Sequence, residues 1–330
     1  MESEVAGSVM DETRDGTTRH EPSAAGPMPS FVVIGAQKSA STFLQDQLSQ
    51  HPDVEIPEGE VRAFEEPFYG DGAVEALPSL YVRPVGEAVR GIKRPDYLGR
   101  PEIPARLRAH LPDAKLLVVL REPVARAVSS YYHFVRHGFV PLAPIDEAMA
   151  HLLAGEWDRR YPRAPEVLAY GRYGEHLERY LGHFSRDRLL VFDQQELIKH
   201  PQDSLRRAFA FVGVDPDFEL PPRSVRASNT GVYSPFRLRM LRTKNRTRFT
   251  YTESLDRRYP RRMTPWGWLY NASLVGLDRL VLSHFDEGRP PALSAPTRQA
   301  LTDYYAEDRD RLGAVLKHWD LSPDWLRTSD

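Results

Sequence analysis

Short runs of apolar residues alternate with amphipathic segments along the first two thirds of the chain. Three of these runs have the length and composition of strands that are buried on both faces: 31–35, 115–120 and 188–192. Each precedes a segment whose apolar residues recur at helical spacing, namely 40–50, 124–135 and 201–212. This alternation predicts an α/β fold with a central parallel sheet flanked by helices on both faces. Ligands of such sheets bind at the carboxyl ends of strands, so the segments after Ile34 and Leu120 are the first places to search.

The two ends of the chain depart from this alternation. Residues 1–29 are polar and rich in Gly, Ser and Thr, so we expect a flexible tail there, followed by a single domain over residues 30–330. Within that domain, residues 237–262 carry ten Lys or Arg against two acidic residues, a net charge of +8. Aromatic residues follow directly, and we interpret residues 237–290 as a basic and aromatic insertion or cap. A last helix is predicted over 297–319.

Composition and charge exclude several classes of protein. The 330 residues include no cysteine, which excludes disulfide scaffolds, thiolate metal sites and cysteine nucleophiles. The formal net charge of −2 argues against a general nucleic-acid binder, so no nucleic-acid partner is expected. No apolar run approaches the ~20 residues that cross a bilayer, and the N-terminus lacks a secretory signal pattern. We therefore expect a cytoplasmic protein without a transmembrane segment.

His133 and His137 have zinc-ligand spacing but no third ligand, so no metal is expected.

The segment from Gly35 to Thr42 joins the first predicted strand to the helix after it. Its small residues let the backbone approach a ligand closely, and the N–H groups and dipole of a helix N-terminus attract an anion of phosphate size. Lys38 adds a positive charge, and Ser41 and Thr42 add hydroxyl donors. The alternative is an ordinary turn with a helix-capping serine. A Walker A loop is not expected, because no glycine directly precedes Lys38 and the later strand ending at Leu120 leads into Arg121 rather than an aspartate.

A second constellation follows the predicted strand 115–120. Arg121 stands at the carboxyl end of this strand, where a planar guanidinium can clamp a phosphate, and Ser129 lies about two helical turns further on. The alternative pairs Arg121 with Glu122 or with a neighbouring helix.

Together these segments resemble sulfotransferases that use PAPS (3′-phosphoadenosine 5′-phosphosulfate), of the carbohydrate or heparan-sulfate type and related bacterial enzymes. Residues 35–42 are similar to the family's 5′-phosphosulfate loop, and residues 121–129 to its 3′-phosphate motif. The resemblance covers residues 31–214 and implies the P-loop-like parallel sheet of that fold. Ala40 departs from the family pattern, which usually has glycine there. The resemblance implies that the donor is bound by Gln37, Lys38, Ser39, Ala40, Ser41, Thr42, Arg121, Ser129, Tyr173 and Arg226.

The resemblance also implies a catalytic set. Lys38 is the cation expected to neutralise the leaving phosphate. Glu60 lies twenty-two residues after Lys38, ahead of an aromatic residue, and is the first choice for the base that takes the acceptor proton. Glu65 and Glu66 compete for this role, because aromatic residues follow them as well. Lys93 begins a Lys-x-Pro-x-Tyr segment and is expected to hold the sulfuryl group or an acidic acceptor.

The expected function is an in-line transfer of a sulfuryl group from PAPS to a hydroxyl of a carbohydrate, a glycolipid or a small natural product. The transfer releases PAP, the desulfated nucleotide. In this interpretation the basic stretch 237–262 covers the donor or attracts an acidic acceptor. Two alternatives stay open. One is a module that binds PAP or PAPS without catalysis, and the other is a protein that binds polyanions or a membrane surface. Peripheral contact with a membrane is compatible with the leading interpretation as well.

Overall fold

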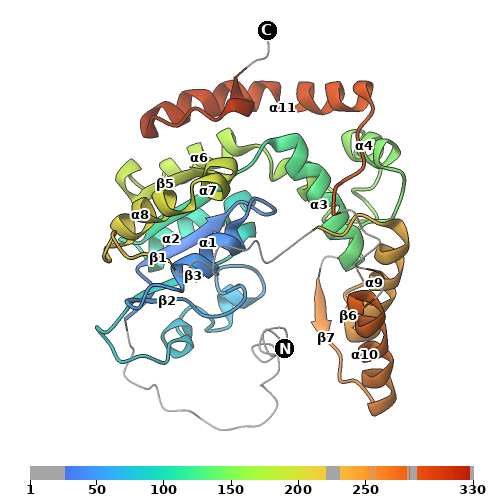
Figure 1. The fold of residues 1–330 in the computed structure, drawn as a ribbon, viewed down its shortest axis with the longest axis horizontal. Helices are drawn as coiled ribbons and strands as arrows, with labels where there is room; N and C mark the ends of the chain where they lie inside the picture. Colours follow the sequence, from blue (N-terminus) through green and yellow to red (C-terminus); the bar gives the residue numbers. More distant parts are fainter. Residues whose placement is uncertain are drawn as a thin grey trace. The chain divides into compact units, whose positions relative to one another are not determined.

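The structure is a computed structural model, and it describes residues 27–220, 231–253, 255, 257–280, 282 and 288–327. The chain forms two compact units, and Figure 1 labels most of their helices and strands. The larger, called here the sheet unit, contains the described residues within 15–122, 172–228 and 307–330. The smaller, called the helical unit, contains those within 123–171 and 229–306. The segment 237–290, predicted to be an insertion or cap, falls within the helical unit.

Five strands form one parallel sheet in the sheet unit, in the order β2-β3-β1-β4-β5. Their bounds are Val54–Glu55 for β2, Val89–Lys93 for β3, Phe31–Gly35 for β1, Lys115–Leu120 for β4 and Leu189–Asp193 for β5. Val32 of β1 lies opposite Ile92 of β3 on one side and Leu116 of β4 on the other. The carboxyl end of β1 therefore lies between those of β3 and β4, as the predicted parallel sheet requires.

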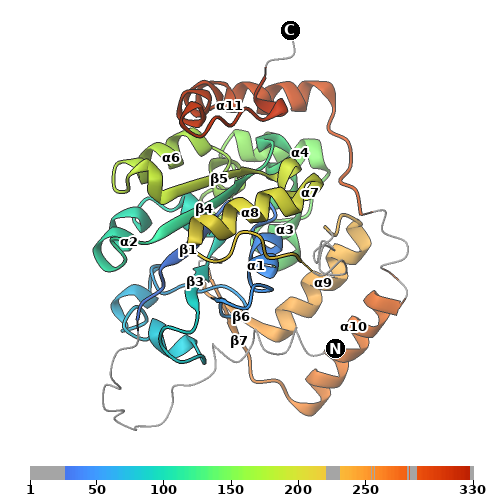
Figure 2. The ribbon, with the colours of Figure 1, turned by 60° about the vertical axis from the view of Figure 1, so that its left-hand side comes forward.

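Helices cover both faces of this sheet, because alternate strand residues point to opposite faces and nearly all of them are apolar. The helices of the sheet unit are α1 (Ser41–Leu48), α2 (Ile103–His110), α6 (Tyr173–Leu181), α7 (Gln194–Lys199) and α8 (Pro201–Val212). One face packs Val33 and Val119 against α1 and α8, which lie side by side in Figure 2. The other packs Val32 and Val118 against α2 and α6. The prediction of helices on both faces is therefore confirmed.

The last part of the chain completes the sheet unit. Helix α11 (Ala295–Leu316) starts in the helical unit, and its residues from 307 onward belong to the sheet unit. The carboxylate of Asp308 accepts hydrogen bonds from the backbone N–H groups of Gly174 (3.0 Å) and Glu175 (2.9 Å) at the start of α6. The indole N–H of Trp319 donates to the Leu189 carbonyl (2.9 Å), and that of Trp325 donates to the Asp193 carboxylate (2.7 Å).

The helical unit is built around α3, which packs against α5 and α9. Its helices are α3 (Pro123–His137), α4 (Ile145–Leu153), α5 (Glu166–Ala169), α9 (Pro235–Arg248), α10 (Pro265–Leu280) and the first part of α11. Strands β6 (Phe249–Tyr251) and β7 (Arg258–Pro260) form an antiparallel hairpin between α9 and α10. The hairpin is tied to the end of α3, since the Tyr251 hydroxyl donates to the His137 carbonyl (2.6 Å) and Arg258 Nη1 lies 2.7 Å from His137 Nδ1.

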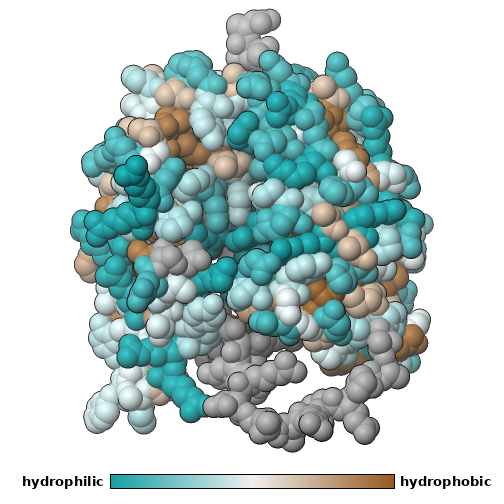
Figure 3. Space-filling model, turned by 180° about the vertical axis from the view of Figure 1, so that it is seen from behind, coloured by the Kyte–Doolittle hydropathy of each residue, from teal (hydrophilic) through white to brown (hydrophobic). Residues whose placement is uncertain are grey.

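Hydrophilic residues cover most of the face drawn in Figure 3, and apolar residues lie there in small, separate groups. Across the described part of the chain, no helix is both long enough and apolar enough to cross a bilayer.

Candidate active site

The loop between β1 and α1 places a helix N-terminus without a side-chain cap at the carboxyl end of β1. Strand β1 ends at Gly35 and α1 begins at Ser41. Ala40, the residue before the helix, has the left-handed conformation (φ 70°, ψ 22°) and no side-chain oxygen that could cap the helix. The first-turn N–H groups therefore have no side-chain partner from the capping position. This is the geometry that binds a phosphate or sulfate group.

The left-handed conformation of Ala40 gives a testable prediction. An L-residue in this region costs ~1–2 kcal/mol, and glycine avoids this cost but has more freedom in the unfolded chain. We expect Ala40→Gly to raise the free energy of unfolding by about 0.5–1 kcal/mol, measured by urea unfolding. Ala105→Gly, at an exposed position in the first turn of α2, is the matched control and should lower this free energy by up to ~1 kcal/mol. Equal losses for both variants would contradict the assigned backbone conformation.

Gly35 brings a second segment against this loop. A Cβ atom at Gly35 would lie 2.8 Å from Leu98 Cβ and 3.0 Å from the Pro95 carbonyl oxygen, so only glycine fits here without a shift. The residues after β3 can therefore turn across the end of β1, where residues 95–99 form a 3-10 helix. Asp96 reaches the loop from this turn, whereas Lys93 is the last residue of β3 itself.

Arg121 and Tyr173 hold the loop from two sides. Arg121 follows β4, the neighbour of β1, and its Nη1 donates to the Lys38 carbonyl oxygen (3.1 Å). The Tyr173 hydroxyl lies 3.5 Å from that of Ser39, and both side chains are fully buried. The two predicted motifs in this unit, the loop and the strand end with Arg121, are thus adjacent in space. The side chain of Lys38 itself is half-buried, so it has access to solvent.

Lys93 lies beside the start of α1. Its Nζ donates to Thr42 Oγ1 (3.1 Å), and the residue is only 3% exposed. Burial lowers the pKa of Lys93, while the nearby carboxylates of Glu60 and Asp46 act in the opposite direction. A largely desolvated ammonium group therefore stands next to the loop between β1 and α1.

Arg94 organises the acidic residues around Lys93. Its guanidinium donates to both carboxylate oxygens of Glu65 (2.6 and 3.0 Å), to Asp96 (2.9 Å) and to Glu60. Burial opposes the charge of Arg94, but the three carboxylates outweigh it and raise the pKa of Arg94 well above its usual value. The other oxygen of Asp96 accepts a hydrogen bond from Gln37 Nε2 (2.9 Å), which links this network to the loop.

The three candidate bases have different surroundings. The side chain of Glu65 is 4% exposed, and Arg94 binds both of its oxygens, which is a structural ion pair. Glu66 pairs with Arg106 (2.5 Å), which lies over the Tyr69 ring, and its side chain is 55% exposed. Glu60 is 40% exposed and near enough to Lys93 to influence its charge. Glu60 thus combines contact with solvent and proximity to the loop.

The structure gathers most of the predicted donor-binding residues at one place in the sheet unit. Ser129 is the exception, because it belongs to the helical unit, where it is buried on α3. Arg226 lies outside the described residues. Sequence reasoning missed Arg94 and Asp96 as organisers of the site. The sequence did offer one signal for this role, since Arg94 and Asp96 are charged residues close to Lys93 in the same segment. The three carboxylates that Arg94 binds, however, come together only in the folded protein.

Comparison with known proteins agrees with this geometry. The family model described as a sulfotransferase domain matches residues 28–230, which is more than half of the chain. The chain therefore belongs to the sulfotransferase family, and the predicted resemblance is confirmed.

Two curated relatives and one solved structure illustrate the similarity. Heparan sulfate glucosamine 3-O-sulfotransferase 3B1 of Homo sapiens is 30% identical over 58% of this chain and 48% of its own length. Bifunctional heparan sulfate N-deacetylase/N-sulfotransferase 2 of Bos taurus is 30% identical over 57% of this chain and 22% of its own length. A crystal structure of a sulfotransferase from Alicyclobacillus acidocaldarius has a TM-score of 0.60 and 25% identity, and covers 91% of this chain and all of its own. The chain spans about half the length of the first of these curated relatives.

Proposed function

We propose that this protein transfers a sulfuryl group from PAPS to a hydroxyl group of a glycan. The observation that carries the proposal is the convergence of Lys38, Arg121 and Lys93 on the loop at the carboxyl end of β1. In a chain of the sulfotransferase family, three cations around an uncapped helix N-terminus fit a donor that carries several negative charges.

In this proposal the loop and Arg121 bind opposite ends of the donor. The N–H groups at the start of α1, with the hydroxyls of Ser41 and Thr42, hold the 5′-phosphosulfate. Arg121 binds the 3′-phosphate, and the resemblance adds Ser129 and Arg226 to that role. Gln37, Ser39, Ala40 and Tyr173 shape the loop, since their contacts fix its backbone.

The proposed chemical step is a direct displacement at sulfur. Glu60 takes the proton of the acceptor hydroxyl, and the acceptor oxygen forms a bond to sulfur. The bond between sulfur and the bridging oxygen of the donor breaks, and its electron pair stays on the 5′-phosphate of PAP. Lys38 stabilises the charge that develops on that oxygen, and Lys93 holds the sulfuryl oxygens in line.

The names of the curated relatives support a glycan acceptor, and heparan sulfate is the first acceptor to test. The direct experiment incubates the protein with PAPS and heparan sulfate and measures both PAP release and sulfate incorporation into the glycan. Equimolar appearance of both products would support the proposal. Tight PAP binding in calorimetry without turnover on any hydroxyl acceptor would instead identify a binding module.

Arg121→Ala is expected to weaken PAP binding. A charge-assisted hydrogen bond to a phosphate contributes about 1.5–3 kcal/mol, so the dissociation constant should rise about tenfold to a hundredfold. Titration calorimetry with PAP measures this effect. Arg206→Ala on the exposed side of α8 is the matched control and should leave the affinity unchanged. Equal PAP affinity of Arg121→Ala and the unchanged protein would contradict the placement of the 3′-phosphate.

A further inference from the structure

Helix α10 of the helical unit has its large apolar residues on the outside. Trp266 is 80% exposed, Leu277 is 44% and Leu280 is 78%. Leu269 (53%) and Tyr270 (47%) lie between them at helical spacing, so the five side chains share one stripe along the helix. We call this stripe the α10 surface. Figures 1 and 2 both show α9 and α10 side by side in this unit.

Polar side chains of α10 contact α9. Asn271 is 6% exposed, and its Nδ2 lies 3.0 Å from Thr247 Oγ1. Asp278 accepts two hydrogen bonds from Arg237 of α9 (2.7 and 3.0 Å). A helix of a water-exposed protein has the opposite arrangement, with apolar residues inward and polar residues outward. The α10 surface therefore needs an apolar partner.

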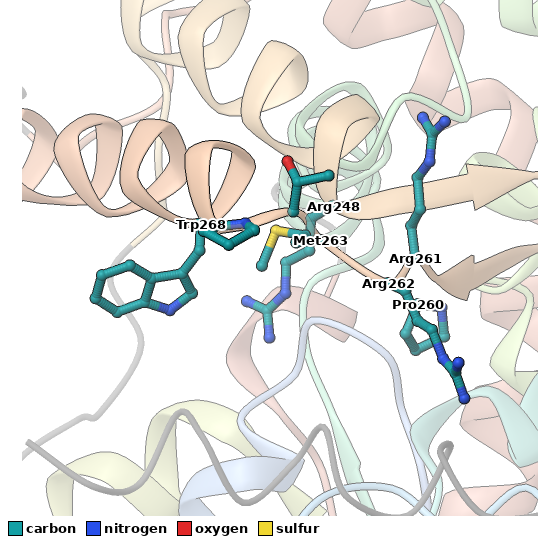
Figure 4. A pocket seen from close by; sticks show the side chains of 8 residues that line it. Arg248, Pro260, Arg261, Arg262, Met263 and Trp268 are labelled. Carbon is teal, nitrogen blue, oxygen red and sulfur yellow. The ribbon is translucent and has the colours of Figure 1, made fainter.

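Cations stand next to the start of α10. Arg248, Arg261 and Arg262 line a cavity of about 400 Å³ together with Thr264 and Trp268. Figure 4 shows Arg248 and Arg262 extending to one side of this segment and Arg261 to the other. Within the described parts of the chain, no carboxylate forms an ion pair with any of these three guanidinium groups. Asp278 is already paired with Arg237, and the side chains that line the cavity include three arginines and no carboxylate.

We propose that the α10 surface, together with the arginine cavity beside the start of α10, binds the surface of a bilayer that contains anionic phospholipids. Tryptophan and tyrosine favour the interface between lipid headgroups and acyl chains, and leucine inserts into its apolar side. Arg248 and Arg262 would contact the headgroup phosphates. A second copy of this chain is a poorer partner for this surface, because it would bring the same uncompensated arginines close together. This inference is independent of the proposed reaction, since it concerns the location of the protein and not its chemistry.

Vesicle binding tests the proposal with the full chain. We expect the protein to sediment with phosphatidylcholine vesicles that contain phosphatidylserine, and this binding should weaken as salt is raised. Trp266→Glu combined with Leu277→Glu should reduce the apparent affinity at least about tenfold, because two apolar insertions are lost. Arg248→Gln combined with Arg262→Gln should also reduce it about tenfold.

Matched controls distinguish this surface from general effects of apolar or cationic residues. Val82→Glu with Ile198→Glu changes exposed apolar residues of the sheet unit, and Arg159→Gln with Arg298→Gln changes exposed arginines of the helical unit. Both pairs should leave vesicle binding unchanged, and thermal unfolding should verify that all variants are folded. Absence of binding to anionic vesicles, equal binding to pure phosphatidylcholine, or equal losses in the controls would overturn the proposal. A dimer that Trp266→Glu with Leu277→Glu dissociates, in a protein that does not bind vesicles, would assign the surface to a second copy.

Discussion

Replacing Lys38 with alanine is expected to lower the rate of PAP release by about 10²–10³-fold at saturating donor and acceptor. Lys38 belongs to the loop whose backbone Arg121 holds, so the backbone that carries its side chain is already in place before the donor binds. In the proposed step, negative charge develops on the bridging oxygen as the bond to sulfur breaks. A preorganised cation stabilises this charge in the transition state more than in the bound donor, and its loss therefore affects turnover most.

The control for this experiment is Lys199→Ala, which removes an exposed lysine from the last turn of α7. It should leave turnover unchanged. If Lys38→Ala keeps more than about a third of the original rate, Lys38 does not stabilise the leaving group, because one lost donor of this kind costs far more.

Glu60→Gln is expected to lower turnover about a hundredfold or more while PAP affinity stays nearly constant. The base acts on the acceptor proton and does not contact the donor nucleotide. Turnover should therefore fall while the affinity for PAP does not change. Glutamine keeps the size and hydrogen-bonding capacity of the side chain but cannot accept a proton at neutral pH. PAP release and PAP calorimetry on the same preparation measure both quantities.

Glu66→Gln is the matched control, since Glu66 pairs with Arg106 away from Lys93 and should tolerate the change. Glu65→Gln should instead act on stability, because it weakens the buried pairing with Arg94. An inactive Glu66→Gln together with an active Glu60→Gln would move the role of base to Glu66.

The sequence pattern predicted the strands with continuous apolar runs well and missed the strands whose apolar runs are short or interrupted. Residues 31–35 and 115–120 are strands β1 and β4 as predicted, because continuous apolar runs signal burial on both faces. The third strand runs from Leu189 to Asp193, one residue later than predicted, and Asp193 caps the helix α7 that follows. Strand β3 was missed because Arg90 and Gly91 interrupt its apolar character. Arg90 is nevertheless buried, and its Nη2 donates to the Arg83 carbonyl oxygen.

The local sequence pattern also predicted the loop at residues 35–42 better than it predicted the ion pairs of Arg94 beside this loop. A short stretch of sequence is enough to recognise the change from strand to helix at residues 35–42 and the basic residue Lys38 within it. The contacts of Arg94 depend on Glu60, Glu65 and Asp96, which meet only when the segment after β3 crosses the end of β1. The predicted last helix likewise ends earlier, at Leu316, and a 3-10 turn continues to Trp319.

The contacts of residues 308–325 with α6 and β5 have a consequence for how the protein folds during its synthesis. The matched family region ends at residue 230, but Asp308 caps the start of α6 and Trp319 and Trp325 bind β5 and the residue that ends it. These contacts join residues that are 130 or more positions apart, so the entropy cost of closing long loops must be overcome before the contacts stabilise the fold. During synthesis, the packing of the sheet unit can therefore be completed only after residues 308–325 have been made. The start of α6, which supplies Tyr173 to the loop, is among the last elements of the unit to be secured.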